Sequence, residues 1–180
     1  MVHDQIRTAW QTRWTIGKFK DPDGVVEKLS RAGKSIAELK ALMPDRFIEA
    51  PVIQGNLALN EGIAELLLLL TGGTATAYNN TNARIGVGDS STAESASQTG
   101  LQAATNKLWK AMDATYPTIA SQTVTFKSTF GTSEANFAWN EFTVVNASDD
   151  TGDNLNRKVS AKGTKVSGET WIAQVDITVS

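Results

Sequence analysis

The C-terminal segment constrains the fold of this chain most. Between positions 171 and 179 every second residue is apolar, in the row Trp171, Ala173, Val175, Ile177 and Val179. Successive side chains of a β-strand point to opposite faces, so this row lies on one face. The segment therefore predicts a strand whose apolar face packs inward.

Weaker patterns of the same kind predict further strands. Val124, Phe126, Ser128 and Phe130 alternate with polar residues. The other extended segments are 10–19, 47–59, 83–87 and 137–144, whereas 101–112 has no clean period and stays unassigned. Short strands joined by turn-rich loops, with one dominant helix, are typical of a β-sandwich or a partly closed barrel. We predict a mainly β fold with one buried helix and a small helical insertion near the N-terminus.

The N-terminal region contains this insertion. Asp21-Pro22-Asp23-Gly24 predicts a turn after the first strand. Two short helices follow, the second with Ser35 as N-cap and Glu38 three residues later. Their basic residues favour a solvated or partner-facing excursion over core packing. We therefore divide the chain into an N-terminal arm, 1–51, and a β-rich structural domain, 52–180.

A leucine-rich helix is predicted at about 60–71. Asn60 is the expected cap, and Gly72-Gly73 provides a left-handed stop. Leucines from Leu66 to Leu70 would cover every side of the helix, so an exposed face would be apolar. We expect the helix to be buried within the fold or against a partner. The apolar run is too short to cross a membrane.

Composition argues against several functional classes. The chain has 180 residues, a formal net charge of -2, no cysteine and one histidine. The charge gives no broad positive field for nucleic acid, and disulfides or thiolate metal sites are excluded. The start MVHDQIRTAW lacks the pattern of a secretory signal, which indicates synthesis in a cytoplasm. We predict no enzyme, no cofactor and no membrane contact.

Three motifs have an alternative functional interpretation. Gly86-Val87-Gly88-Asp89 lacks the full phosphate-loop pattern and favours a glycine turn at a strand end. The acidic segment 146–154 offers oxygen ligands but no EF-hand spacing, so a solvated loop is preferred and a cation site stays open. His3 is favoured as a surface residue of the N-terminus rather than a catalytic base. We assign no catalytic, cofactor-binding or metal-binding residue.

Glu141 stands among aromatic residues of a predicted strand. A catalytic acid is one interpretation, and a carboxylate satisfied by an arginine or a backbone amide is the preferred one. Arg84 and Arg157 are the candidate partners.

The tryptophans raise the question of a carbohydrate-binding platform. Trp139 and Trp171 belong to strand patterns that need core residues, whereas Trp10 and Trp14 could be core or could pack on another subunit. Our candidate partner interface consists of Trp10, Trp14, Phe19, Leu39 and Leu42.

A pattern of short motifs over roughly residues 54–180 resembles uncharacterised structural proteins of tailed bacteriophages. In order, these motifs are Gly55-Asn56-Leu57, Leu59-Asn60-Glu61-Gly62, Asn82-Ala83-Arg84-Ile85-Gly86-Val87-Gly88-Asp89-Ser90, Gln98-Thr99-Gly100-Leu101, Phe130-Gly131, Glu134-Ala135-Asn136-Phe137-Ala138-Trp139-Asn140-Glu141-Phe142, Leu155-Asn156-Arg157-Lys158 and Thr164-Lys165-Val166-Ser167-Gly168-Glu169-Thr170-Trp171. The layout is also similar to the phage tail-collar fibre module. It departs from that module where Phe142-Thr143-Val144 follows Glu141 and where no long fibre repeats follow.

The resemblance implies a structural protein of a phage particle. The preferred expectation is a capsid decoration or cement protein that binds the major capsid protein or other virion subunits and stabilises the assembled head. The alternatives are a tail, collar or baseplate component that anchors a fibre, and a module that binds host glycans. In each case we expect a homo-oligomer or a lattice-bound protein, made in the host cytoplasm and located in the virion.

Overall fold

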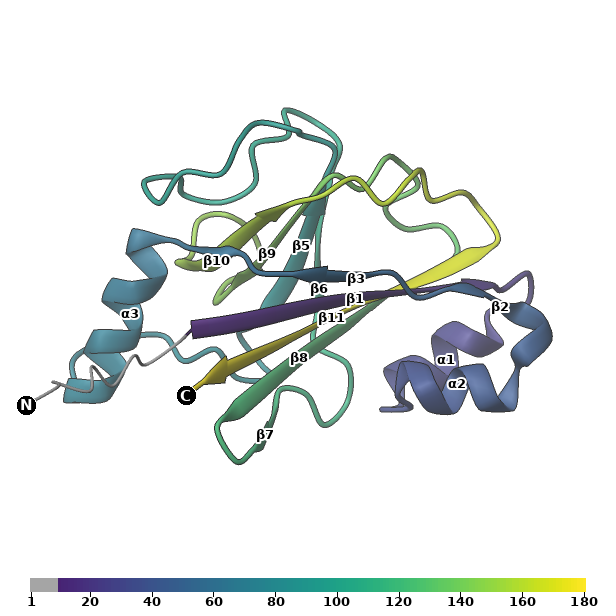
Figure 1. The fold of residues 1–180 in the computed structure, drawn as a ribbon, viewed down its shortest axis with the longest axis horizontal. Coiled ribbons are helices and arrows are strands. Elements are labelled where there is room, and N and C mark those ends of the chain that lie inside the picture. Colours follow the sequence, from purple (N-terminus) through teal and green to yellow (C-terminus); the bar gives the residue numbers. More distant parts are fainter. Residues whose placement is uncertain (1–9) are drawn as a thin grey trace, which may run out of the picture.

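The computed structural model describes residues 10–180, which form two antiparallel β-sheets and three α-helices (Figure 1). The strands are β1 (Trp10–Lys20), β2 (Phe47–Glu49), β3 (Val52–Gln54), β4 (Leu57–Ala58), β5 (Arg84–Gly88), β6 (Lys107–Ala111), β7 (Thr118–Ala120), β8 (Thr123–Phe130), β9 (Glu141–Val145), β10 (Asn154–Val159) and β11 (Glu169–Val179). The helices are α1 (Val25–Arg31), α2 (Ile36–Leu42) and α3 (Asn60–Thr71), with a 3-10 turn η1 (Pro44–Arg46). The predicted mainly β, sandwich-like fold is confirmed, and the arrangement is not a closed barrel.

The first sheet is built around the pairing of β1 with β11. Its order is β2-β1-β11-β8-β7, and β3 also pairs with β1. The pairing of β1 with β11 runs without a register shift from Trp10 opposite Val179 to Lys20 opposite Glu169. The predicted C-terminal strand is therefore confirmed as a central strand, and the proline-marked segment supplies β2 and β3 at the sheet edge.

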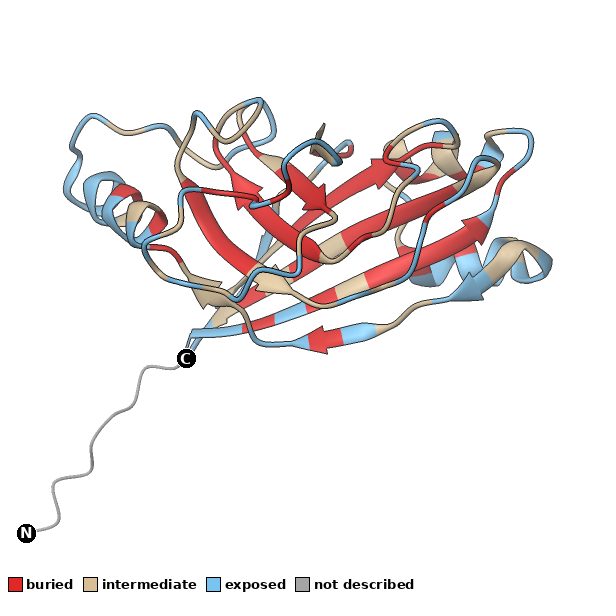
Figure 2. Ribbon diagram, turned by 90° about the horizontal axis from the view of Figure 1, so that it is seen from above, coloured by how far each residue is buried: buried red, intermediate tan, exposed pale blue. Residues whose placement is uncertain are grey.

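The second sheet has the order β4-β10-β9-β5-β6, and its strands cross those of the first sheet (Figure 1). Residues 55–56 carry the chain from β3 in the first sheet to β4 in the second. Figure 2 shows buried residues along the strands of both sheets and exposed residues on the helices and loops. The two sheets thus enclose one core.

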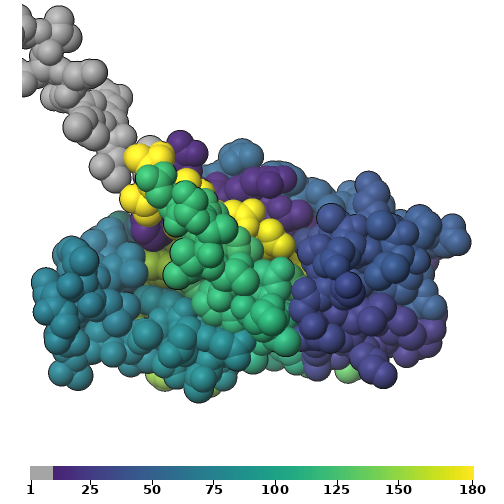
Figure 3. Space-filling model, turned by 90° about the horizontal axis from the view of Figure 1, so that it is seen from below, coloured from purple at the N-terminus to yellow at the C-terminus, as the bar shows by residue number. Residues whose placement is uncertain are grey.

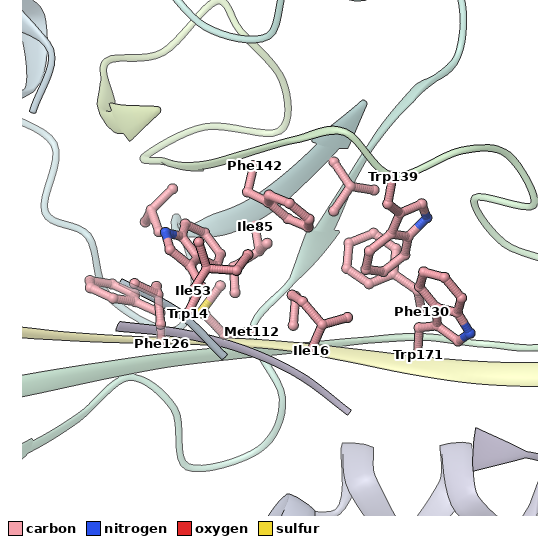
Figure 4. Close-up of a cluster of buried hydrophobic side chains, with 14 of the residues drawn as sticks. Trp14, Ile16, Ile53, Ile85, Met112, Phe126, Phe130, Trp139, Phe142 and Trp171 are labelled. Atoms are coloured by element: carbon pink, nitrogen blue, oxygen red, sulfur yellow. The ribbon is translucent and has the colours of Figure 1, made fainter. Parts of the chain in front are cut away.

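The core consists of aromatic and branched side chains from both sheets (Figure 4). Trp14 of β1 faces Phe142 of β9 with ring centroids 5.5 Å apart. Trp139 lies edge-on to Phe130 at 4.8 Å and to Trp171 at 4.9 Å. The prediction that Trp139 and Trp171 are core residues is confirmed.

Helices α1 and α2 form the predicted helical insertion, but they pack on the outer face of the first sheet, which the expectation of a solvated or partner-facing excursion did not include. Phe19, Val26, Leu39 and Ile172 are fully buried there in a second apolar cluster. The predicted turn at 21–24 and the Ser35–Glu38 capping box are confirmed. The basic residues suggested a solvated segment, but they lie only on the outer sides of the two helices. The inner side of each helix is apolar and packs on the sheet.

Two buried charges fix α1 to this sheet. Asp21 accepts hydrogen bonds from the amides of Val26 and Glu27, the first turn of α1, at 3.0 and 2.9 Å. Lys127 donates to the carbonyl of Ser30 at 3.0 Å and lies 3.1 Å from Asp113. Because Asp21, directly after β1, and Lys127 of β8 hold the two ends of the helix, α1 is an integral part of the fold.

The division at residue 51 does not separate two bodies. Strand β1 lies inside the first sheet, with β11 on one side and β2 and β3 on the other. Because β2 ends before position 51 and β3 begins after it, the boundary falls between two strands that pair with the same neighbour. The described residues 10–51 are therefore part of the β-rich domain.

Helix α3 spans the predicted range and ends at Gly72, whose φ of 71° is left-handed. The N-cap is Leu59 rather than Asn60, and it makes no side-chain capping bond. Only Gly62 and Glu65 are buried in this helix, so the prediction of a helix buried within the fold is wrong. No helix among residues 10–180 is long and apolar enough to cross a membrane.

Candidate partner-binding surface

An apolar groove opens at the end of the sandwich where β1 begins and β11 ends. It lies between α3 on one side and β7, β8 and β11 on the other, and its volume is about 440 Å³. Figure 3 shows the recess between α3 (teal) and the green segment of β7 and β8. Six of its lining residues are Trp10, Leu69, Tyr78, Ile119, Leu155 and Val179. None of the described residues that line the groove is charged.

The groove reaches into the core of the protein. Phe126 and Ile177, which form part of its lining, are almost completely buried members of the main core. Tyr78 packs against the core and directs its hydroxyl to the carbonyl of Asp153 at 2.9 Å. Burial raises the pKa of Tyr78 above its ordinary value. The groove is therefore the open end of the space between the two sheets.

The outer side of α3 forms an apolar ridge beside this groove, which we define as Ile63, Leu67 and Leu70. These positions recur at i, i+4 and i+7 and therefore lie in one row along the helix. Leu67 is 56% exposed and Leu70 81% exposed. Complete burial of one leucine side chain contributes about 1.5–3 kcal/mol. Covering the ridge with another protein surface would therefore contribute a substantial favourable free energy of binding.

The orientation of α3 follows from contacts on its inner side. A Cβ atom at Gly62 would lie 2.4 Å from Leu155 Cα, so only glycine lets the helix backbone approach β10 this closely. Glu61 accepts a hydrogen bond from the Asn154 amide at 2.7 Å, and Glu65 accepts one from Asn146 Nδ2 at 3.0 Å. Both acidic side chains of α3 are therefore directed toward β10 and Asn146, away from the ridge.

The five residues of the predicted interface are dispersed by the fold. Trp14, Phe19 and Leu39 are fully buried in the two apolar clusters of the chain, so they are corrected to core residues. Trp10, 36% exposed, lines the groove. Leu42, 59% exposed, lies on α2 at the opposite end of the molecule (Figure 1). The alternating pattern placed Trp10 and Trp14 on the same face of the strand. It could not show that the second sheet covers Trp14 but does not extend as far as Trp10.

Sequence reasoning missed most of the groove. It identified the leucines of α3, but Ile119, which is 80% exposed, lies in a segment that had no assigned element. A strand of three residues with one isoleucine is too short to show an alternating pattern, so the sequence does not reveal β7. Leu155 belongs to β10, whose polar sequence NLNRKV hides the strand.

Glu141 is held by structural contacts. Its carboxylate accepts hydrogen bonds from the amides of Gln102 and Ala103 and from Arg157 Nε, the last at 2.8 Å. Arg84 instead donates to the carbonyls of Thr81 and Ala83. The predicted pairing with an arginine is confirmed, and the arginine is Arg157.

The GVGD motif reaches the end of a strand, as predicted, but its glycines belong to the strand and not to a turn: Gly86 lies within β5 and Gly88 is its last residue. Gly86 and Gly88 belong to β5, where a Cβ atom at Gly86 would lie 2.7 Å from the Trp109 ring and one at Gly88 would meet Glu141 Oε1. The predicted turn is wrong, because these glycines are needed where they make room for side chains of β6 and β9.

The carboxylates of the acidic segment 146–154 bind different partners and do not converge on one point. Asp149 accepts hydrogen bonds from Thr151, and Asp150 accepts one from the Leu101 amide at 3.2 Å. Burial raises the pKa of Asp150, countered by the nearby Lys107. Within residues 10–180 no group of three or more His, Cys, Asp or Glu side chains could hold a metal ion. His3 lies outside the described residues.

Comparisons with known proteins add no relative. No protein-family model matches the chain, no curated protein matches it, and no solved structure matches its fold. The assignment of a function therefore rests on the residues and their arrangement.

Proposed function

We propose that this chain is a non-enzymatic structural subunit of a tailed-bacteriophage particle, and specifically a capsid decoration protein that binds the assembled head. The observation that carries the binding role is the apolar ridge of α3 beside the apolar groove. Apolar residues gathered on one exposed surface and bordered by polar ones are typical of a site of contact with another protein. The motif pattern over residues 54–180 supports the phage context.

The burial of the charged groups supports a structural role. Glu141 and Arg157 pair with each other, Asp113 pairs with Lys127, and Asp21 holds the start of α1. Each of these buried charges is used to fasten a loop or helix to a sheet. They hold helix α1 and the loop after β5 against the two sheets.

The glycan-binding alternative needs several exposed aromatic residues on one face. Trp14, Trp139 and Trp171 are instead core residues, and Trp10 is only partly exposed at the groove. This placement argues against a tryptophan platform. A tail, collar or baseplate position would use the same apolar surface and remains the alternative location.

Co-sedimentation with phage heads tests the proposed function. Purified protein is added to heads that lack it, and bound protein is measured after centrifugation. Saturable binding is expected, as is a rise in the thermal stability of the protein on the lattice, because a partner that binds only the folded form stabilises it. Binding to purified tails but not to heads would select the alternative location, and binding to neither would overturn the proposal.

A further inference from the structure

The first residue of β1 lies in the wall of the apolar groove. Trp10 lines the groove together with Val179, which is its partner on β11. Strand β1 begins at Trp10 and β11 ends at Val179, so the pairing of the two strands stops at the groove. Residues 1–9 are therefore attached to the chain at the edge of this recess.

The groove is narrow enough for residues 1–9 to cross it. Its lining follows the first sheet from Trp10 on β1, across β11 and β8, to Ile119 on β7. Neighbouring strands lie about 4.8 Å apart, so these steps amount to about 14 Å. An extended chain reaches at most about 3.3–3.6 Å per residue, so a segment of this length reaches about 30 Å. Residues 1–9 can therefore lie across the groove from wall to wall.

The segment MVHDQIRTA also contains a large apolar residue at a suitable distance from the groove wall. Ile6 stands four residues before Trp10, which gives it a reach of at most about 14 Å. The far wall carries Ile119, which is 80% exposed, and no described lining residue is charged. An isoleucine side chain buried there would leave water together with the apolar lining, which is favourable.

We infer that residues 1–9 of this chain cross its own groove and that the Ile6 side chain fills it. A segment attached at the groove wall acts at an effective concentration of about millimolar, an advantage that no separate molecule has. The α3 ridge stays uncovered and available to a partner. The inference goes beyond the proposed function, because it concerns the isolated protein and holds whatever that partner is.

An intramolecular disulfide tests the position of the segment. Because the chain has no cysteine, the variant Gln5→Cys/Gln122→Cys carries one pair, with Gln122 in the groove lining and Ile6 retained. Mild oxidation should give a linked monomer, at a yield that does not change on dilution.

The matched control is Gln5→Cys/Thr178→Cys. Thr178 precedes Val179, the partner of Trp10, and lines a polar pocket on the other face of the sheet. A disulfide needs Cα atoms about 4.4–6.8 Å apart, so this control should link at least about fivefold less. Equal yields of linked monomer in the two variants would overturn the inference, and so would disulfide-linked dimers, which would place the segment on another copy.

A charge at Ile6 tests which side chain holds the segment. Added to Gln5→Cys/Gln122→Cys, Ile6→Asp should lower the yield of linked monomer several-fold, since it places a carboxylate in an apolar recess. His3→Asp adds a carboxylate to the same segment but keeps Ile6, so it should change the yield little. A yield that Ile6→Asp leaves unchanged would overturn the role of Ile6.

This inference and the proposed function fail separately. The disulfide is measured on the isolated protein, so its absence would overturn the position of residues 1–9 and leave binding to heads through the ridge as proposed. Failure to sediment with heads or tails would overturn the proposed function, whereas a linked monomer in the same protein would still support the inference.

Discussion

Glu141 on β9 and Arg157 on β10 form an ion pair with both side chains fully buried, the Arg157 Nη2 atom lying 2.7 Å from Glu141 Oε2. Arg157 also donates to the carbonyl of Thr92 and to Gln98, both at 3.0 Å, and Glu141 binds the amides of residues 102 and 103. The pair thus fastens the long polar loop after β5 to the second sheet.

Removing one partner of this pair should be costly. Arg157→Met leaves the Glu141 carboxylate buried without its counter-charge, which destabilises a protein by about 3–5 kcal/mol. Denaturant unfolding measures this loss. The control is Lys34→Met, which breaks the exposed Lys34–Glu38 pair and should change stability little. Equal effects of the two substitutions would contradict the structural role of the pair.

Two tryptophans of β1 should differ sharply on truncation. Trp14 is fully buried against Phe142, so Trp14→Ala should lower the free energy of unfolding by about 3–5 kcal/mol. Trp10 lies at the groove and is partly exposed, so Trp10→Ala should cost much less and should instead weaken partner binding. Thermal unfolding and co-sedimentation of both variants separate the two roles, and similar losses of stability would contradict the burial difference.

The close approach of α3 to β10 predicts a strict requirement at Gly62. A methyl group there would overlap the backbone of Leu155, so Gly62→Ala should destabilise the protein by about 1–3 kcal/mol despite the higher helix propensity of alanine. Ala64→Ser, on the exposed side of the same helix, is the control and should have little effect. A stabilising Gly62→Ala would show that the helix does not sit on this strand.

Lys165 gives a prediction on pH. Its fully buried amine donates to the Gly131 carbonyl and to Asn136 Oδ1, and burial lowers its pKa from 10.5 to about 8. Below pH 8 the Lys165 amine is charged in both the folded and the unfolded protein, so the cost of burying this charge destabilises the folded state in full. Between the two pKa values the unfolded chain binds the proton and the folded protein does not, so stability increases with pH.

Lys165→Met removes this titration. The stability of the wild type relative to this variant should therefore rise between about pH 8 and pH 10.5, by up to about 3 kcal/mol. Urea unfolding of both proteins across this window measures the difference. A constant or falling difference would contradict a depressed pKa of Lys165.

The strongly periodic parts of the fold could be predicted from the sequence. Strand β11 and helix α3 were found because alternation and a glycine stop are local signals. Which side of α3 faces water could not be predicted, since five consecutive leucines indicate no direction. That side is set by Gly62 and Glu65, whose contacts come from β10 and from Asn146, far along the chain.

Strand β10 could not be predicted because, apart from Leu155, its buried residues are polar. Asn154, Asn156 and Arg157 are fully buried and bond to β9: Asn154 accepts from the Thr143 hydroxyl, Asn156 accepts from the Val144 amide, and Arg157 donates to Glu141. A polar strand gives no hydrophobic period, and its partners are known only once the sheet is formed. The groove depends on this strand, so its location was also beyond sequence reasoning.

Immunogold labelling of intact virions with an antibody against this chain tests the central claim most directly. We predict gold particles spread over the head surface, and no label after the antibody is absorbed with the purified protein. Label confined to the neck or tail would contradict decoration of the head. Absence of label from the whole particle, together with absence of the chain from purified virions, would contradict a structural role in the virion.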